Sequence, residues 1–107
     1  MALYELRTYT LYVGKLPEAV ALYGEAGWAA LEAGGFAAKL VGYFTSDAGT
    51  LNQIVHLWKF DDDADRRRHW TTLGPDPGFQ AFADRLRPLI QRQEVQLLQA
   101  APWGPHP

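Results

Sequence analysis

Four stretches whose side chains alternate with a period of two, separated by segments of helical period, run through this chain of 107 residues. The alternating stretches are residues 3–11, 39–45, 52–60 and 90–98, and the helical segments are residues 16–33, 62–73 and 77–86. This order of strand, helix, strand, strand, helical pair and strand is that of the split βαβ plan. We therefore predict an α+β, ferredoxin-like βαββαβ fold with a four-stranded antiparallel sheet. Right-handed crossovers would place the first and third strands side by side at its centre, and we expect that central pair to run parallel.

Proline and aspartate mark the ends of the predicted helices. Pro17 suits the first turn of the first helix, where a missing N–H costs nothing. Residues 61–63 are three aspartates, which offer N-cap oxygens and a favourable negative charge to the next helix. Asp76 can cap the last helix, with Pro77 at its first position and Pro88 beyond its end.

Composition narrows the class of protein. The 10 basic and 12 acidic side chains give a net charge of -2, which argues against the phosphate attraction that nucleic-acid binding needs. The chain has no cysteine, and no apolar run approaches the ~18 residues of a membrane span. Its first residues resemble no signal peptide, so we expect a cytoplasmic protein. We predict one domain over residues 1–102, followed by a loose tail, rich in proline and glycine, over residues 103–107.

The two helical regions can cover only one face of the predicted sheet. The other face would carry large apolar side chains, which rarely stay bare in a monomer. A second copy of the chain is the simplest cover, so we predict a homodimer with its sheets face to face.

The two rows of side chains on the third strand differ in chemistry. Val55 and Leu57 are aliphatic, and we expect them to face the helices, as we do Tyr4 and Leu6 on the first strand. The alternate row, predicted to face the space between two subunits, comprises Ile54, His56, Trp58 and Phe60. The neighbouring strands would add Glu5, Arg7, Tyr9, Glu94 and Gln96 to this space.

Such a space could bind a small aromatic or polycyclic molecule. Trp58 and Tyr9 would stack on it, and Arg7 would bind a carboxylate or enolate oxygen. His56 is the sole histidine inside a regular strand, and a neighbouring carboxylate could hold its pKa near working pH for proton transfer. The predicted catalytic residues are His56, Arg7, Glu5 and Tyr9, and the predicted ligand-binding residues are Trp58, Tyr9, Asn52, Phe60, Glu94 and Gln96.

Each of these residues also has a structural interpretation. Glu5 and Arg7 can form a partly buried ion pair that sets the register of a dimer. His56 can be a hydrogen-bonded interface residue, and His69 and His106 are expected at the surface. One histidine with a glutamate lacks the three protein ligands of a catalytic zinc, and no nucleotide-binding motif is present. We therefore predict neither a metal nor another cofactor.

Three motifs carry a resemblance to a known family. They are YELRTYT at residues 4–10 followed by Gly14-Lys15, LNQIVHLW at residues 51–58, and Asp76-Pro77. Together they resemble the NIPSNAP family from Tyr4 to about Pro102. The positions that match the recurrent motif residues, and that the resemblance marks as important to a site or a dimer, are Glu5, Arg7, Tyr9, Asn52, His56 and Trp58. Asp63 and Trp70 depart from the expected pattern, which has leucine and a polar residue there, so the rim of the cavity would differ.

The resemblance implies a dimeric α+β barrel and says much less about activity. The family is associated with vesicular transport through its early naming and with mitochondrial proteins in animals. Related barrel proteins include cofactor-free monooxygenases, haem-degrading enzymes, dehydratases and polyketide cyclases. A shared fold does not choose among these activities.

Two functional hypotheses remain open from the sequence. The first is a dimeric barrel that binds a small aromatic ligand and acts as a cofactor-independent isomerase, cyclase or monooxygenase, with His56 moving the proton. The alternative is a non-catalytic dimer or adaptor whose outer helices bind another protein. A cavity of ~300 Å³ or more lined by His56, Arg7 and Trp58 would favour the first, and a filled interface would favour the second.

Overall fold

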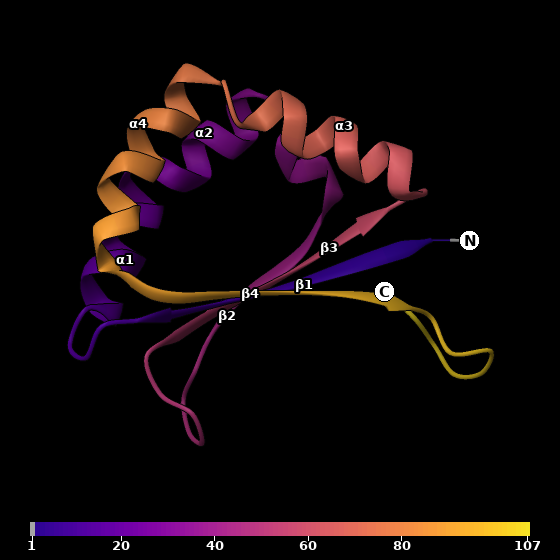
Figure 1. Ribbon diagram of the computed structural model, residues 1–107, viewed down its shortest axis with the longest axis horizontal. Coiled ribbons are helices and arrows are strands. Elements are labelled where there is room, and N and C mark those ends of the chain that lie inside the picture. Colours follow the sequence, from indigo (N-terminus) through magenta and orange to yellow (C-terminus); the bar gives the residue numbers. More distant parts are fainter. Residues whose placement is uncertain (1) are drawn as a thin grey trace.

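The computed structural model describes residues 2–107, which form a sheet with all of the helices packed over one of its faces (Figure 1). The strands are β1 (Leu3–Leu11), β2 (Leu40–Thr45), β3 (Gln53–Phe60) and β4 (Ile90–Gln99). The α-helices are α1 (Leu16–Leu22), α2 (Trp28–Ala33), α3 (Asp63–Leu73) and α4 (Pro77–Leu86), with a π-helical turn η1 (Tyr23–Gly27) and the 3-10 turns η2 (Phe36–Lys39) and η3 (Arg87–Leu89). The predicted α+β, ferredoxin-like order of elements is confirmed.

The strand order in the sheet is β2-β3-β1-β4, and every neighbouring pair is antiparallel. The expectation that β1 and β3 would run parallel was therefore wrong. The helical crossover after β1 brings β2 back in the same direction as β1, and the hairpin between β2 and β3 then reverses the chain. β3, which lies between β1 and β2 in the sheet, is consequently antiparallel to both of them.

The first helical region is interrupted by the π-helical turn η1 between α1 and α2. A methyl group at Gly27, the last residue of this turn, would lie 2.7 Å from two ring carbons of Phe82 and 2.9 Å from a ring carbon of Tyr23. Glycine at this position therefore allows the turn to pack directly on α4. Within α1, Leu22 is buried and Val20 is exposed.

Aspartate side chains cap α3 and α4 as predicted. Asp62 accepts a hydrogen bond of 2.8 Å from the backbone N–H of Asp65, and Asp76 accepts one of 3.0 Å from that of Phe79. Each bond satisfies a backbone donor that has no partner within its helix. These caps fix where the two helices begin above the sheet.

The chemically mixed row of β3, not its aliphatic row, lies under the helices. This row is Ile54, His56, Trp58 and Phe60, and each of these residues is at most 3% exposed. The strand register places Glu5 beside Trp58 and Arg7 beside His56, on the same face. The prediction that these side chains face a space between two subunits was therefore wrong. Large aromatic side chains bury more apolar area against helices than short aliphatic ones do, and this favours the observed orientation.

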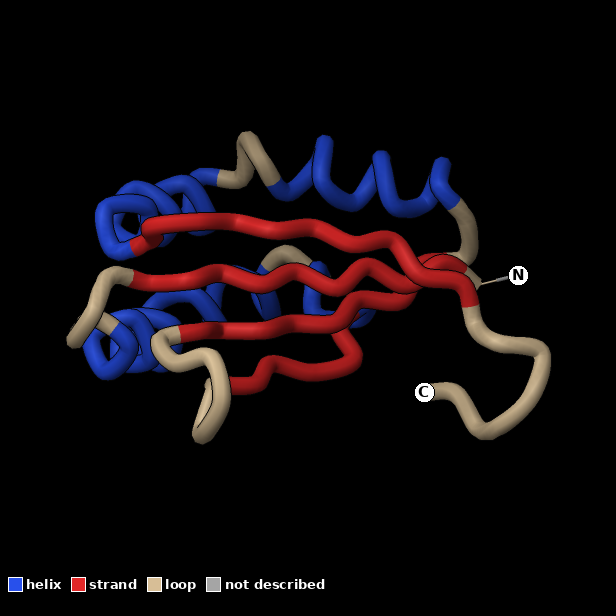
Figure 2. Tube along the Cα trace, turned by 60° about the horizontal axis from the view of Figure 1, so that its bottom comes forward, coloured by secondary structure: helices blue, strands red, loops and turns tan. Residues whose placement is uncertain are grey.

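The helices leave the other face of the sheet uncovered (Figure 2). Val55 and Leu57 alternate along β3 with the buried row, and so belong to this uncovered face. Val55 pairs in register with Phe44, which is 59% exposed, and Leu57 pairs with Leu6. Tyr4 also belongs to this face, contrary to prediction, and its hydroxyl donates a hydrogen bond of 2.7 Å to the carbonyl oxygen of Pro107. Most of this apolar face is left without helical cover.

Two features are absent from residues 2–107: a helix able to span a membrane and a cluster of metal-ligating side chains. No helix in this range combines the length and apolarity that crossing a bilayer requires. Nor does the range bring three or more histidine, aspartate or glutamate side chains together in a way that could hold a metal ion.

Candidate functional site

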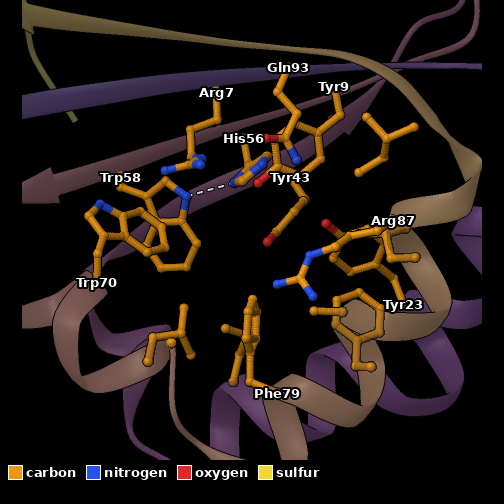
Figure 3. Close-up of a pocket in the computed structure, with 17 residues that line it drawn as sticks. Arg7, Tyr9, Tyr23, Tyr43, His56, Trp58, Trp70, Phe79, Arg87 and Gln93 are labelled. Atoms are coloured by element: carbon orange, nitrogen blue, oxygen red, sulfur yellow. Dashed lines mark hydrogen bonds between the residues drawn. The ribbon is translucent and has the colours of Figure 1, made fainter.

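A cavity of about 280 Å³ lies between the sheet and the helices (Figure 3). All four strands contribute to its floor, through Arg7, Tyr9, Tyr43, His56, Trp58 and Gln93. The helical layer contributes aromatic walls, through Tyr23, Trp70, Phe79 and Phe82. The cavity thus combines flat apolar surfaces with a small number of polar groups, as small-molecule sites commonly do.

His56 is held in one orientation and one tautomer by its neighbours. The indole Nε1 of Trp58 donates a hydrogen bond of 2.7 Å to Nδ1 of His56. The ring of Tyr43 stacks on the imidazole at 4.5 Å, and the ring of Tyr9 meets its edge at 4.8 Å. An indole N–H can only donate, so Nδ1 must accept, and the proton of the neutral imidazole sits on Nε2.

The Nε2 atom of His56 is buried and has no hydrogen-bond partner within residues 2–107. Burial, and then the positive charge of Arg7, lower the pKa of His56 to about 3. The imidazole is therefore neutral at physiological pH and presents an N–H donor. The expectation that a carboxylate would hold its pKa near working pH was wrong, because burial dominates and the charge that acts on His56 is the guanidinium of Arg7.

Arg7 belongs to a buried cluster of three charged groups. Its Nη1 lies 3.0 Å from Glu5, a carboxylate with no exposed surface, and Glu5 also accepts a hydrogen bond from Arg66 of α3. The guanidinium of Arg7 stacks on Trp70, 4.6 Å from the ring centre. Burial opposes the charge of Arg7, but the nearby Tyr9 and Glu5 outweigh it and raise its pKa. Arg66 also lies 3.5 Å from Asp63, and of these charged groups it is the guanidinium of Arg7 that lines the cavity.

Tyr23 of η1 and Tyr43 of β2 are neutral donors at the cavity. Burial raises the pKa of Tyr23 and of Tyr43 well above the ordinary value; Tyr43 and Tyr9 raise that of Tyr23 further, and Tyr9 raises that of Tyr43. Of residues 2–107, those that line the cavity include no aspartate and no glutamate. The site is consequently rich in donors and suits a ligand with acceptor oxygens.

Four residues that the sequence marked for the site do meet in this cavity, although on the opposite face of the sheet from the one expected: Arg7, Tyr9, His56 and Trp58. Glu5 lies behind the cavity wall and contacts Arg7. The alternative interpretation of Glu5 and Arg7 as an ion pair is thus met in geometry, but the pair lies under the helices and not in the space between two subunits where it was expected to set the register of a dimer.

The other predicted ligand-binding residues lie outside the cavity. Asn52 is in the turn before β3, where its carbonyl accepts a hydrogen bond from the N–H of Leu11. Phe60 packs in the apolar core. Glu94 and Gln96 pair in register with Thr8 and Leu6, and so belong to the face without helices. The sequence predicted correctly that Glu94 and Gln96 face away from the helices, but the cavity lies on the helical side of the sheet.

Several lining residues were missed because their signals are not local. Tyr43 pairs in register with His56 across the β2–β3 hairpin, a relation visible only once the hairpin register is known. Trp70 was noted only as a departure from the family pattern, and it forms a cavity wall. His69 does not line the cavity, but it too was expected at the surface and is only 8% exposed, among aromatic rings that include Phe36 and Trp58.

The chain matches a known protein family and several solved structures. The model of the family described as NIPSNAP matches residues 4–105 of the chain. The chain belongs to the NIPSNAP family. A solved NIPSNAP family protein from Agrobacterium tumefaciens is 32% identical to this NIPSNAP chain, with a TM-score of 0.90 and 98% of each chain covered. A NIPSNAP domain protein from Burkholderia xenovorans is 35% identical, with a TM-score of 0.84 and coverage of 97% and 99%.

Curated relatives of this NIPSNAP chain are longer proteins. The NipSnap homolog of Dictyostelium discoideum is 26% identical over 95% of the chain, which spans 39% of that relative. The human NipSnap homolog 3A is 33% identical over 61% of the chain, a match that spans 27% of that relative. A structure described as an antibiotic biosynthesis monooxygenase shares the fold, with a TM-score of 0.63, 15% identity and coverage of 94% and 99%.

Proposed function

We propose that this NIPSNAP chain binds a small aromatic or polycyclic ligand in the cavity between its sheet and its helices, and stabilises negative charge on a ligand oxygen. The observation that carries the proposal is the buried Nε2–H of His56, which has no partner within residues 2–107. A buried donor without a partner is costly, and a ligand oxygen at this point would satisfy it.

The surroundings of that donor favour an oxygen that becomes anionic. Arg7 adds positive charge on the same side of the cavity, and no carboxylate among residues 2–107 lines it. Preorganised donors in a site shielded from water stabilise a phenolate or enolate more than they stabilise the neutral form. Trp58 and Trp70 offer flat surfaces on which the ring system can stack.

Such a site would favour loss of a ligand's hydroxyl proton to water, and the resulting phenolate or enolate is the activated form in cofactor-independent isomerisation, cyclisation or oxygenation by dioxygen. In this scheme His56 is an oxyanion donor, since its Nδ1 already accepts from Trp58 and is not free to take a proton. The fold that the chain shares with the antibiotic biosynthesis monooxygenase is compatible with this chemistry. At about 280 Å³, the cavity is close to the ~300 Å³ at which small-molecule sites begin.

The binding proposal is tested with 2-naphthol and naphthalene, followed by quenching of tryptophan fluorescence. We expect the wild-type protein to prefer 2-naphthol, and His56→Phe to weaken 2-naphthol binding about tenfold while changing naphthalene binding little. Glu94→Gln, outside the cavity, is the matched control, and circular dichroism checks folding. Equal affinity for the two compounds in the wild-type protein would contradict the proposal.

We also propose that the face of the sheet without helices pairs with a second copy of the chain. The support is its exposed apolar surface, which includes Phe44 at 59% exposure beside Val55 and Leu57. Light scattering during size-exclusion chromatography should give twice the chain mass for the wild-type protein and a lower mass for Phe44→Glu. A monomeric wild-type protein at micromolar concentration would contradict this part of the proposal.

A further inference from the structure

Arg87 is a second positively charged group at the cavity, remote from Arg7 in the sequence. It follows α4 directly, as the first residue of η3, and it lines the cavity although its side chain is 67% exposed. Figure 3 shows its guanidinium turned toward the cavity across from Arg7, near Tyr23 and Phe79. The exposure and the orientation together place Arg87 where the cavity opens to solvent.

The guanidinium of Arg87 contributes little to the stability of the fold. Within residues 2–107 it pairs with Asp84, whose carboxylate lies 3.0 Å from Nη1 of Arg87 and is itself 73% exposed. An exposed pair three residues apart contributes little to stability. A guanidinium has five N–H donors, so most of them remain free for a ligand even while this ion pair persists.

We propose that Arg87 binds a carboxylate of the ligand at the mouth of the cavity, so that the ligand class is an aromatic carboxylic acid with a hydroxyl or keto oxygen at its far end. This inference rests on the proposed function, in which His56 and Arg7 receive that far oxygen. The planar fork of a guanidinium matches the two oxygens of a carboxylate.

The neighbourhood of Arg87 makes this assignment specific. Arg87 follows the carboxyl end of α4, which carries partial negative charge. Without the guanidinium, this partial charge would repel a ligand carboxylate. Loss of Arg87 should therefore weaken the binding of an anionic ligand strongly and that of a neutral ligand little. Arg85 offers a matched comparison, because it is also exposed and ion-paired, to Glu25, but does not line the cavity.

The experiment compares 6-hydroxy-2-naphthoate with 2-naphthol on four proteins: wild type, Arg87→Gln, Arg85→Gln and Asp84→Asn. Arg87→Gln should weaken 6-hydroxy-2-naphthoate binding about tenfold or more and leave 2-naphthol within about twofold. Arg85→Gln should change neither affinity. Asp84→Asn should strengthen naphthoate binding, because it removes the competing carboxylate.

The outcomes separate this inference from the function on which it rests. If 2-naphthol binds the wild-type protein but Arg87→Gln leaves naphthoate binding unchanged, or weakens both compounds equally, the role of Arg87 is wrong and the cavity remains a binding site. If 2-naphthol does not bind the wild-type protein, the proposed function and this inference fail together.

Discussion

Trp58 and His56 lie two residues apart on β3 and are joined by a hydrogen bond of 2.7 Å, from the indole Nε1 to the imidazole Nδ1. This single contact decides which imidazole nitrogen carries the proton. It turns His56 from a residue that could exchange protons into one that donates a hydrogen bond from Nε2. The chemistry of the cavity follows from that assignment.

The tautomer can be observed directly. ¹⁵N NMR of the histidine side chains should show His56 as the neutral form protonated on Nε2 at pH 7. Trp58→Phe removes the donor to Nδ1, so both tautomers should become populated and the pKa of His56 should rise, because the bond had favoured the neutral ring. A wild-type imidazole protonated on Nδ1 would contradict the assignment.

Two buried histidines should make the protein sensitive to mild acid. Burial is the main cause that lowers the pKa of His56 to about 3 and that of His69 to about 4. The unfolded chain, with histidine pKa values of about 6.5, then binds more protons than the native state, so stability is full above pH ~6.5 and falls below it.

The expected loss is about 1.4 kcal/mol per pH unit for each of these histidines between pH ~6 and 5. Urea unfolding at a series of pH values measures it. His56→Gln should roughly halve this dependence, whereas His106→Gln, in the exposed tail, should leave it unaltered. A free energy of unfolding that stays flat from pH 7 to 5 would show that neither histidine is held neutral.

Arg7 and Arg67 should differ sharply in their contribution to stability. Arg7→Ala leaves the buried Glu5 with only Arg66, and breaking a buried ion pair costs about 3 kcal/mol or more. Arg67 is 73% exposed and paired with Asp63, so Arg67→Ala should cost no more than about 0.5 kcal/mol. Chemical denaturation of both variants tests this, and indistinguishable values would refute the buried cluster.

The π-helical turn η1 provides a matched pair of glycines. Gly27→Ala would bring a methyl group to 2.7 Å from Phe82, and overpacking of this kind costs about 1–3 kcal/mol. A methyl group at Gly24, in the same turn, would meet nothing within 4 Å, so Gly24→Ala should be neutral or stabilising by up to about 1 kcal/mol. Similar thermal stability of the two variants would contradict the packing of η1 on α4.

The order of elements was readable from the sequence because it depends on local signals. Alternation predicted β1 over residues 3–11, and the capping by Asp76 before Pro77 predicted the start of α4, both as observed. Alternation also separated the two rows of β3 correctly, but it carries no information on which row the helices cover. The aliphatic appearance of Val55 and Leu57 suggested the wrong face.

The contacts at the site that the sequence did not predict share one physical cause. The i, i+4 spacing of Asp62 and Arg66 would suit a local ion pair, yet Asp62 caps the helix and Arg66 reaches Glu5 on β1. Tyr43 and His69 likewise acquire their roles from chain segments distant in sequence. Spacing along the sequence predicts ion pairs between neighbouring residues. The partner of a buried charge is set by the tertiary fold, which spacing does not show.

The pKa of 2-naphthol bound to the wild-type protein tests the donor role of the cavity most directly, by absorbance titration of the complex. The donors of His56 and Arg7 predict a hydroxyl pKa at least about one unit below that of free 2-naphthol, with His56→Phe returning it toward the free value. A bound pKa equal to or above the free value would contradict the account.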